Sequence, residues 1–194
     1  MSGTLGNSTQ EQELLRAVAV WAADCAERAL PLFESRHPTD TRPREAIEGG
    51  RAFGRGKKRD KHLRIVALAA FRAGKDVDEP SKYAARAASL TAAVAYTHTD
   101  LQTGRPGVRQ ARHVLGPAVY AALALETAEG GDSKVGDDVV RSYVFESNDR
   151  LVLTPAGSTN KLGKTLERTI ACCRGALPVS TLLKPIFGPM PSVL

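Results

Sequence analysis

The sequence VRQARHVLGPAVYAALALETAE, residues Val108 to Glu129, decides the fold class. Its apolar residues recur at three- and four-residue steps along one side of a helix, and a second set follows the same spacing on the opposite side. A helix that is apolar nearly all round belongs in the middle of a bundle. Pro117 gives no amide to the carbonyl of His113, so we expect a kink or a fresh helix start there. The stretch predicts an all-α bundle with an interior polar position beside His113 and Tyr120.

Four segments before this stretch also have helical spacing. After a frayed start over residues 1–7, we expect a first helix from a capping box at Ser8 and Glu11 to about Glu34. A second begins at Pro43, and a third has Leu63, Val66, Ala67, Ala70 and Phe71 as its apolar residues and closes at Gly74. The fourth opens at Asp78 and keeps one apolar stripe through His98 to Leu101, which places His98 on the buried side. The two alanine-rich segments therefore form the central helix pair.

The chain length allows one buried domain with an appendage, since it has 194 residues, 42% hydrophobic and 25% charged. We expect the bundle over residues 8–130 and a C-terminal helical or extended appendage over 131–194, which packs on the bundle or on a partner chain. No apolar run is long enough for a membrane span, and the start lacks the features of a secretory signal. The three cysteines indicate reduced thiols in a cytoplasmic protein.

The net charge of +6 comes from one segment, Arg42 to Arg64. This basic segment holds nine basic and three acidic residues, so its excess equals that of the whole chain. A concentrated positive charge attracts phosphates, nucleic acid or an acidic partner, although such a run can also be a solvated turn between helices. Its candidate binding residues are Arg42, Arg44, Arg51, Arg55, Lys57, Lys58, Arg59 and Lys61.

The segment WAADCAERALPLFESRHPTDTRPREAIEGGRAFGRG, Trp21 to Gly56, resembles the signature of the bacterial immunity-protein-five-like family. The matching pattern is close to W-x-x-D-C-A-E-x-x-L-P-L-F-E, then R-P-R-x-A-I-E, then R-A-x-x-R-G. The later ARHVLGPAVYAALALE, Ala111 to Glu126, is similar to the second half of the family, so the resemblance covers about residues 14–128. It implies an all-helical domain assigned to toxin neutralisation.

Two departures from the family pattern affect the expected partner. The basic run from Gly56 to Lys61 stands where we expect a more acidic stretch, and the residues after Glu129 have no recognised counterpart. An inhibitor of a cationic nuclease would present acidic surface to it. The sequence therefore disfavours a nuclease inhibitor and favours an acidic toxin domain as the partner.

Several residues with side chains suited to acid–base or metal chemistry are expected on or beside the inward faces of the helices. His98, His113, Asp24 and Tyr120 could form an acid–base set. Metal-ligand spacing is missing around these residues and Cys25, so we expect no metal and no cofactor. In the structural alternative, Asp24 accepts hydrogen bonds from helix ends or from an arginine of the Arg42-Pro-Arg turn. The other residues to which we assign a structural role are Trp21, Cys25, Glu27, Arg28 and Pro117.

The leading interpretation is a non-catalytic protein-binding module that resembles a toxin immunity protein and binds through the basic segment. The alternative is a small-molecule enzyme or ligand-binding bundle with a pocket between the first, fourth and fifth helices. In it, His98 or His113 transfers a proton, Asp24 and Tyr120 orient the ligand, and the C-terminal appendage serves as a lid or a dimer interface. Nucleic-acid binding is disfavoured because no aromatic residues alternate with the basic ones.

Overall fold

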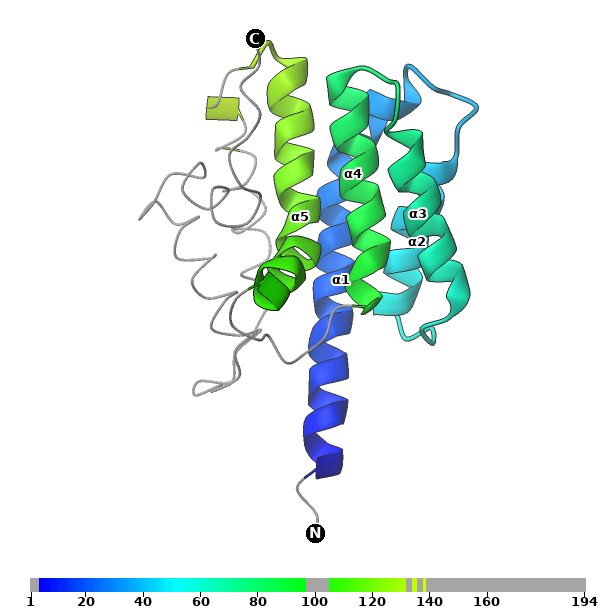
Figure 1. Cartoon of the computed structure of the whole chain (residues 1–194), viewed down its shortest axis with the longest axis vertical. Helices are drawn as coiled ribbons and strands as arrows, with labels where there is room; N and C mark the ends of the chain where they lie inside the picture. The colour runs from blue at the N-terminus through cyan, green and yellow to red at the C-terminus, as the bar shows by residue number, and fades with distance from the viewer. Residues whose placement is uncertain (1–3, 97–104, 132–133, 136–137, 139–194) are drawn as a thin grey trace.

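The computed structural model describes residues 4–96, 105–131, 134–135 and 138, and this part of the chain contains helices and no strand. The helices lie side by side as a bundle (Figure 1). Their bounds are α1 Thr4–Glu34, α2 Arg42–Gly54, α3 Lys61–Ala73, α4 Glu79–Ala93, a 3-10 helix η1 Val94–Tyr96, and α5 Arg105–Ala128. The all-α bundle predicted from the sequence is confirmed.

Local sequence signals set the starts of α2, α3 and α4. Asp60 Oδ1 accepts a hydrogen bond from the Leu63 amide at 3.2 Å, and Asp78 Oδ1 accepts one from the Ser81 amide at 3.1 Å. Each bond satisfies an amide that has no acceptor within the first helical turn. Pro43 lies in the first two positions of α2, where its missing amide is not needed. The expected starts at Pro43 and Asp78 are confirmed.

The first helix begins earlier than its sequence predicts. We expected residues 1–7 to precede it and Ser8 to cap it, but α1 begins at Thr4 and Ser8 lies inside it. No proline interrupts residues 5–13. Extending an existing helix by one residue costs far less than nucleating a new one, so α1 continues past the expected cap.

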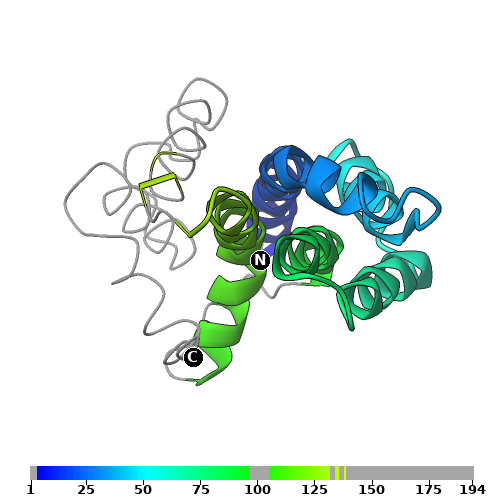
Figure 2. The same cartoon turned by 90° about the horizontal axis from the view of Figure 1, so that it is seen from above.

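The centre of the bundle is α4. It packs against α1, α2, α3 and α5, and the view in Figure 2 shows it between α1, α3 and α5. Nine of its 15 residues are buried, and all nine are small residues or proline. The expected alanine-rich pair exists as α4 and α5, which pack together, but the central position that we gave to α5 belongs to α4. The reason is that α5 keeps Val119, Leu123 and Leu125 only half-buried, whereas the residues that α4 buries against its neighbours are small.

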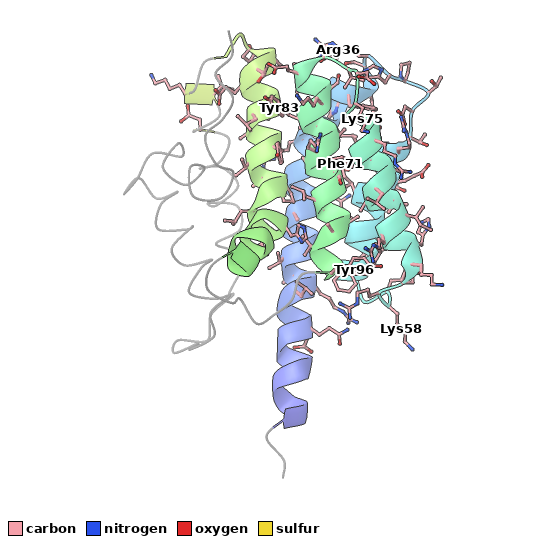
Figure 3. The ribbon with its side chains drawn as sticks, viewed as in Figure 1. Arg36, Lys58, Phe71, Lys75, Tyr83 and Tyr96 are labelled. Carbon is pink, nitrogen blue, oxygen red and sulfur yellow. The ribbon has the colours of Figure 1, made fainter. Side chains whose placement is uncertain are left out.

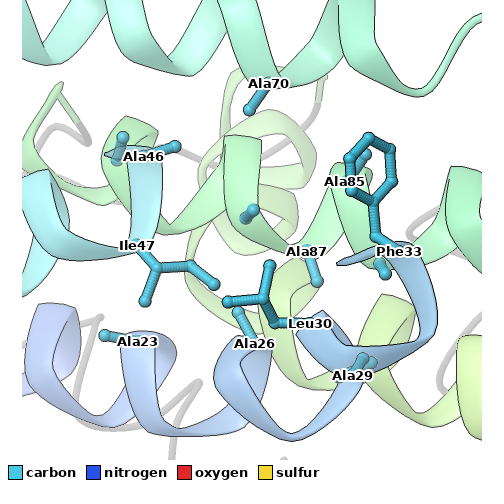
Figure 4. Packing of buried hydrophobic residues seen from close by; sticks show 14 of the residues in the cluster. Ala23, Ala26, Ala29, Leu30, Phe33, Ala46, Ile47, Ala70, Ala85 and Ala87 are labelled. Atoms are coloured by element: carbon cyan, nitrogen blue, oxygen red, sulfur yellow. The ribbon is translucent and has the colours of Figure 1, made fainter. Parts of the chain in front are cut away.

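The core around α4 has few large side chains. Leu30 and Phe33 of α1 and Ile47 of α2 are its large members, and alanines from all five α-helices surround them (Figure 4). Alanines allow helix axes to approach closely, because interaxial distance depends on the side chains at the contact. Cys25 is only 1% exposed and belongs to this core, as predicted for a small buried residue. Trp21 packs against it half-buried.

A glycine of α2 permits close contact with α4. A Cβ on Gly50 would lie 2.7 Å from Thr91 Cγ2 and 3.0 Å from the Thr91 carbonyl oxygen. The buried Thr91 hydroxyl lies 3.2 Å from the carbonyl oxygen of Ala22 in α1 and 3.0 Å from that of Ala87 in its own helix. Gly50 therefore allows α2 to approach α4 closely, although glycine has a low helix propensity.

Helix α5 continues across Pro117 with a bend. Of the two outcomes expected at this proline, a fresh helix start is excluded because Pro117 lies inside one helix. Figure 2 shows the first turns of α5 turned away from the rest of the helix. The missing amide, and the ring beside the carbonyl of His113, account for the bend. Gly116 lies against α4, where a Cβ would collide with the Leu90 side chain.

The fourth helix ends before the predicted residue. We expected it to reach Leu101, but α4 ends at Ala93 and a single tight turn, η1, follows. Contacts from the loop before α3 to Ala95 and Tyr96 hold this turn. His98 lies outside the described residues, as do residues 139–194 of the expected C-terminal appendage. The domain boundary near residue 130 stays a prediction.

Phe71 is among the apolar residues of α3 that point away from the core. Leu63, Val66 and Ala70 of the apolar set that marks this helix are buried, but Phe71, the last member of the set, is 38% exposed. Helical spacing explains the difference, because Phe71 follows Ala70 by one residue and therefore lies about 100° away from it. The Arg86 guanidinium carbon lies 3.7 Å from the centre of the Phe71 ring and partly covers it.

Candidate functional site

The first arginines of the basic segment bind carboxylates of their own chain. Arg42 contacts Asp40 through two N–O distances of 2.8 and 2.5 Å, and Arg44 contacts Glu34 through distances of 2.7 and 2.6 Å. The hydrogen bond from Arg42 lowers the pKa of Asp40, and the hydrogen bond to Glu34 raises the pKa of Arg44. These two pairs partly neutralise the positive charge at the start of α2.

Arg51 connects α2 to α1. Its Nη2 lies 2.9 Å from Asp24 Oδ1 and 2.6 Å from Glu27 Oε2, and only 19% of its side chain is exposed. The hydrogen bond from Arg51 lowers the pKa of Glu27, and the same bond raises the pKa of Arg51. The expected link from Asp24 to the second helix exists, but Arg51 makes it in place of an arginine of the turn. Arg44 of that turn binds Glu34 at the end of α1 instead.

The loop between α2 and α3 is held against η1. Arg59 Nη1 donates to the Ala95 carbonyl oxygen at 3.1 Å, and its guanidinium carbon lies 5.7 Å from the centre of the Tyr96 ring. The Tyr96 hydroxyl donates to the Asp60 carbonyl oxygen. Lys57 and Lys58 are exposed in this loop. The loop therefore presents lysines to solvent on a backbone that is fixed by hydrogen bonds.

An open groove of about 650 Å³ lies between this loop and α3. Its lining residues are Arg59, Asp60, Lys61, Arg64, Ile65, Leu68 and Tyr96. Ile65 is 63% exposed and Leu68 is 49% exposed, which is high for large apolar side chains. Figure 3 shows Phe71 towards one end of α3 and Tyr96 and Lys58 at the other. The site thus combines cations with exposed aliphatic surface, which suits the binding of another molecule by charge and apolar contact.

The residues of the acid–base hypothesis lie on different elements. Asp24 faces α2 through Arg51, whereas Tyr120 of α5 stacks on Tyr83 of α4 with 6.1 Å between ring centres. His113 is half-buried in α5, and His98 lies outside the described residues. In the described part of the chain, no three His, Cys, Asp or Glu side chains are grouped as metal ligands. The acid–base pocket stays a prediction.

Comparison with protein families decides the relationship of this chain. The model of the family described as "Imm-5 like putative immunity protein" matches residues 7–103, half of the chain. The chain belongs to this family. No curated protein and no solved structure matches it. Among the described helices, none combines the length and the apolar character that a membrane span requires.

The Imm-5 like match includes the segment Trp21–Gly56, on which the resemblance was based, and ends before Ala111–Glu126. It covers α1 from its second turn and all of α2 to α4, and therefore both the basic segment and the groove. Sequence reasoning found the cations of this site but missed Ile65, Leu68 and Tyr96. A signal was present, because Ile65 and Leu68 lie outside the apolar stripe that defines the inner side of α3.

Proposed function

We propose that this chain neutralises a toxin by binding it, as an immunity protein without catalytic activity. Membership of the Imm-5 like family carries this proposal. The positive charge of the matched half supports an acidic toxin domain as the partner, because opposite charges speed encounter and suppress wrong partners.

The later half of the basic segment is the proposed contact region. Arg55, Lys57, Lys58 and Lys61 are exposed, and within the described residues none of them makes an ion pair. Their charge is available to an acidic surface, whereas the arginines of α2 are held by carboxylates of the chain itself. Arg59 is used to hold the loop against η1, so its first role is structural.

Co-expression with a toxin tests this proposal. The genes that flank this one are cloned, each product that arrests growth is produced in a bacterial host with and without the chain, and growth is recorded. We expect the chain to restore growth and the purified proteins to form a complex. A chain that neither restores growth nor binds the toxin is not its immunity protein.

Charge reversal then tests the contact region. Lys57→Glu, Lys58→Glu and Lys61→Glu together should slow association with the toxin, and the difference should shrink as salt is added, since salt screens exposed charges. Lys75→Glu with Lys82→Glu, at lysines outside the basic segment, controls for added negative charge as such. Unchanged association of the triple variant would exclude this region from the interface.

A further inference from the structure

The outward side of α3 carries apolar and basic residues and no acid. All charged residues of this helix are basic, and its large aliphatic residues Ile65 and Leu68 are exposed. We call this surface the α3 outer face. Its members are Lys61, Arg64, Ile65, Leu68, Phe71 and Arg72.

Helical spacing brings these six residues onto one side of α3. They are spaced by one or three residues, and at about 100° per residue they fall within an arc of about a third of the helix circumference. The helix has 13 residues, and the face is therefore about 20 Å long. A surface of this length matches three to four turns of another helix.

The α3 outer face rests on a fixed support. The opposite side of α3 packs against α2 and α4, and Asp60 caps the first turn. Beside it, the loop that carries Arg59 is bonded to Ala95 and Tyr96. The backbone of this surface is therefore already ordered before a partner binds, which lowers the entropic cost of association.

Resting on the proposed function, we propose that the α3 outer face is the docking site for an acidic amphipathic helix of the toxin. The apolar stripe of that helix lies along Ile65 and Leu68, in the groove beside Tyr96. Its Asp and Glu residues, on both sides of the stripe, meet Lys61 and Arg64. This is recognition of a helix by a groove, with charge complementarity setting its orientation.

A protein helix fits this surface better than nucleic acid does. Single strands bind by stacking bases on aromatic rings, and the groove has one aromatic ring, Tyr96, whose hydroxyl is bonded to the Asp60 carbonyl oxygen. Ile65 and Leu68 offer branched aliphatic surface, which packs against apolar side chains.

Three peptides of about 14 residues, close to the length of α3, test the docking site directly. All three are cross-linked to hold them helical. The first has a stripe of Leu and Ile flanked by Glu, the second is the first with its sequence scrambled so that no stripe forms, and the third has Lys in place of Glu. Binding to the full chain is measured by fluorescence anisotropy, and a DNA duplex and a single strand of the same charge are included.

We expect the striped Glu peptide to bind and the scrambled and Lys peptides to bind far more weakly. Ile65→Ser with Leu68→Ser should weaken binding by about tenfold without changing the charge. Lys61→Glu with Arg64→Glu should weaken it at least as much. Lys75→Glu with Lys82→Glu is the matched control, because it makes the same charge change outside both the basic segment and the α3 outer face and should weaken binding less.

Several results would overturn the assignment. One is equal binding of the striped and scrambled peptides, or of the aliphatic double variant and the wild type. Preference for DNA would assign the face to nucleic acid, and a wild-type dimer that Ile65→Ser with Leu68→Ser dissociates would assign it to a second copy. If a variant fails to fold, NMR of the wild-type chain with the striped peptide replaces it. Changes in amide chemical shift that fall outside residues 61–72 and the groove contradict the docking site.

The toxin assay separates this inference from the function on which it rests. Outer-face variants that neutralise the toxin as well as the wild type overturn the docking site and leave the immunity function intact. Failure of the wild type to neutralise the toxin overturns the function, while the peptides still test the surface.

Discussion

Replacing Gly50 with alanine should destabilise the bundle, although alanine is the better helix former. The new Cβ would lie 2.7 Å from Thr91 Cγ2 and 3.0 Å from the Thr91 carbonyl oxygen, well inside the usual contact distance of about 3.5 Å. The Thr91 methyl group can rotate only by breaking the hydroxyl contacts to Ala22 and Ala87, and its carbonyl is part of α4. α2 must therefore move away from α4.

The size of the effect follows from two opposing terms. Gly→Ala inside a helix gains about 1 kcal/mol of helix propensity. Overpacking of a filled core costs about 1–3 kcal/mol, and we expect the upper end because one of the two contacts is with backbone. The free energy of unfolding should fall by about 2 kcal/mol. For a chain of this length, that corresponds to a decrease of about 4–8 °C in Tm.

The neighbouring Gly49 supplies the control. A Cβ there would lie 3.2 Å from Leu63 Cδ2 and 3.4 Å from Val66 Cγ2, which are ends of side chains that can adjust. Gly49→Ala has the same propensity gain, so it should leave stability unchanged or raise it by up to about 1 kcal/mol.

Urea unfolding, followed by circular dichroism and by the fluorescence of Trp21, the single tryptophan, compares the two variants. Gly50→Ala with Thr91→Ser should recover part of the loss, because serine lacks the colliding methyl group. Equal stability of the two alanine variants would refute the close contact between α2 and α4.

Three further predictions concern single interactions. Asp78→Ala should lower the free energy of unfolding by about 1 kcal/mol, because the Ser81 amide loses its acceptor at the start of α4. An unchanged urea midpoint would contradict the capping role of Asp78, and so would the same loss of stability in Asp78→Ser. Arg51→Met should raise the pKa of Glu27 towards its ordinary value of 4.5 in an NMR titration, since the hydrogen bond from Arg51 lowers it. Because the pKa of Glu27 is lowered on folding, this carboxylate stabilises the wild type at pH values above its unfolded pKa, and the stabilisation is lost as the pH falls through the folded pKa. The variant should therefore lose less stability in acid than the wild type. A parallel pH dependence of the two proteins would argue against this role of Arg51. Thr91→Val should cost about 1 kcal/mol, because it removes the buried hydroxyl that contacts α1 and α4, and full stability of the valine variant would show that these hydrogen bonds contribute nothing.

The sequence predicts those parts of the fold that depend on neighbouring residues. Pro43 and Asp78 mark helix starts by local chemistry, and both starts are confirmed. The centre of the bundle was harder to predict because a search for apolar stripes favours the leucines of α5. What places α4 in the centre is the small size of the residues that it buries, which matters only when other helices pack around it.

The same division holds for the candidate site. The positive charge of the basic segment is visible in the sequence. Which of its arginines pair with carboxylates depends on distances between helices, as the pairs Arg44–Glu34 and Arg51–Glu27 show. Exposure of Ile65 and Leu68 likewise depends on which side of α3 the other helices cover. Composition alone does not contain this information.

The small residues of α4 affect the entropy of folding as well as its geometry. Alanine has no side-chain rotamers to lose on burial, so an interior built from it forfeits little side-chain freedom when the chain folds. Each buried alanine also removes little apolar area from water, and the bundle must compensate through many close backbone contacts. An interior of this kind tolerates added methyl groups poorly. Exposed side chains of α3 take no part in it, so they can change to suit the proposed partner while the scaffold stays the same.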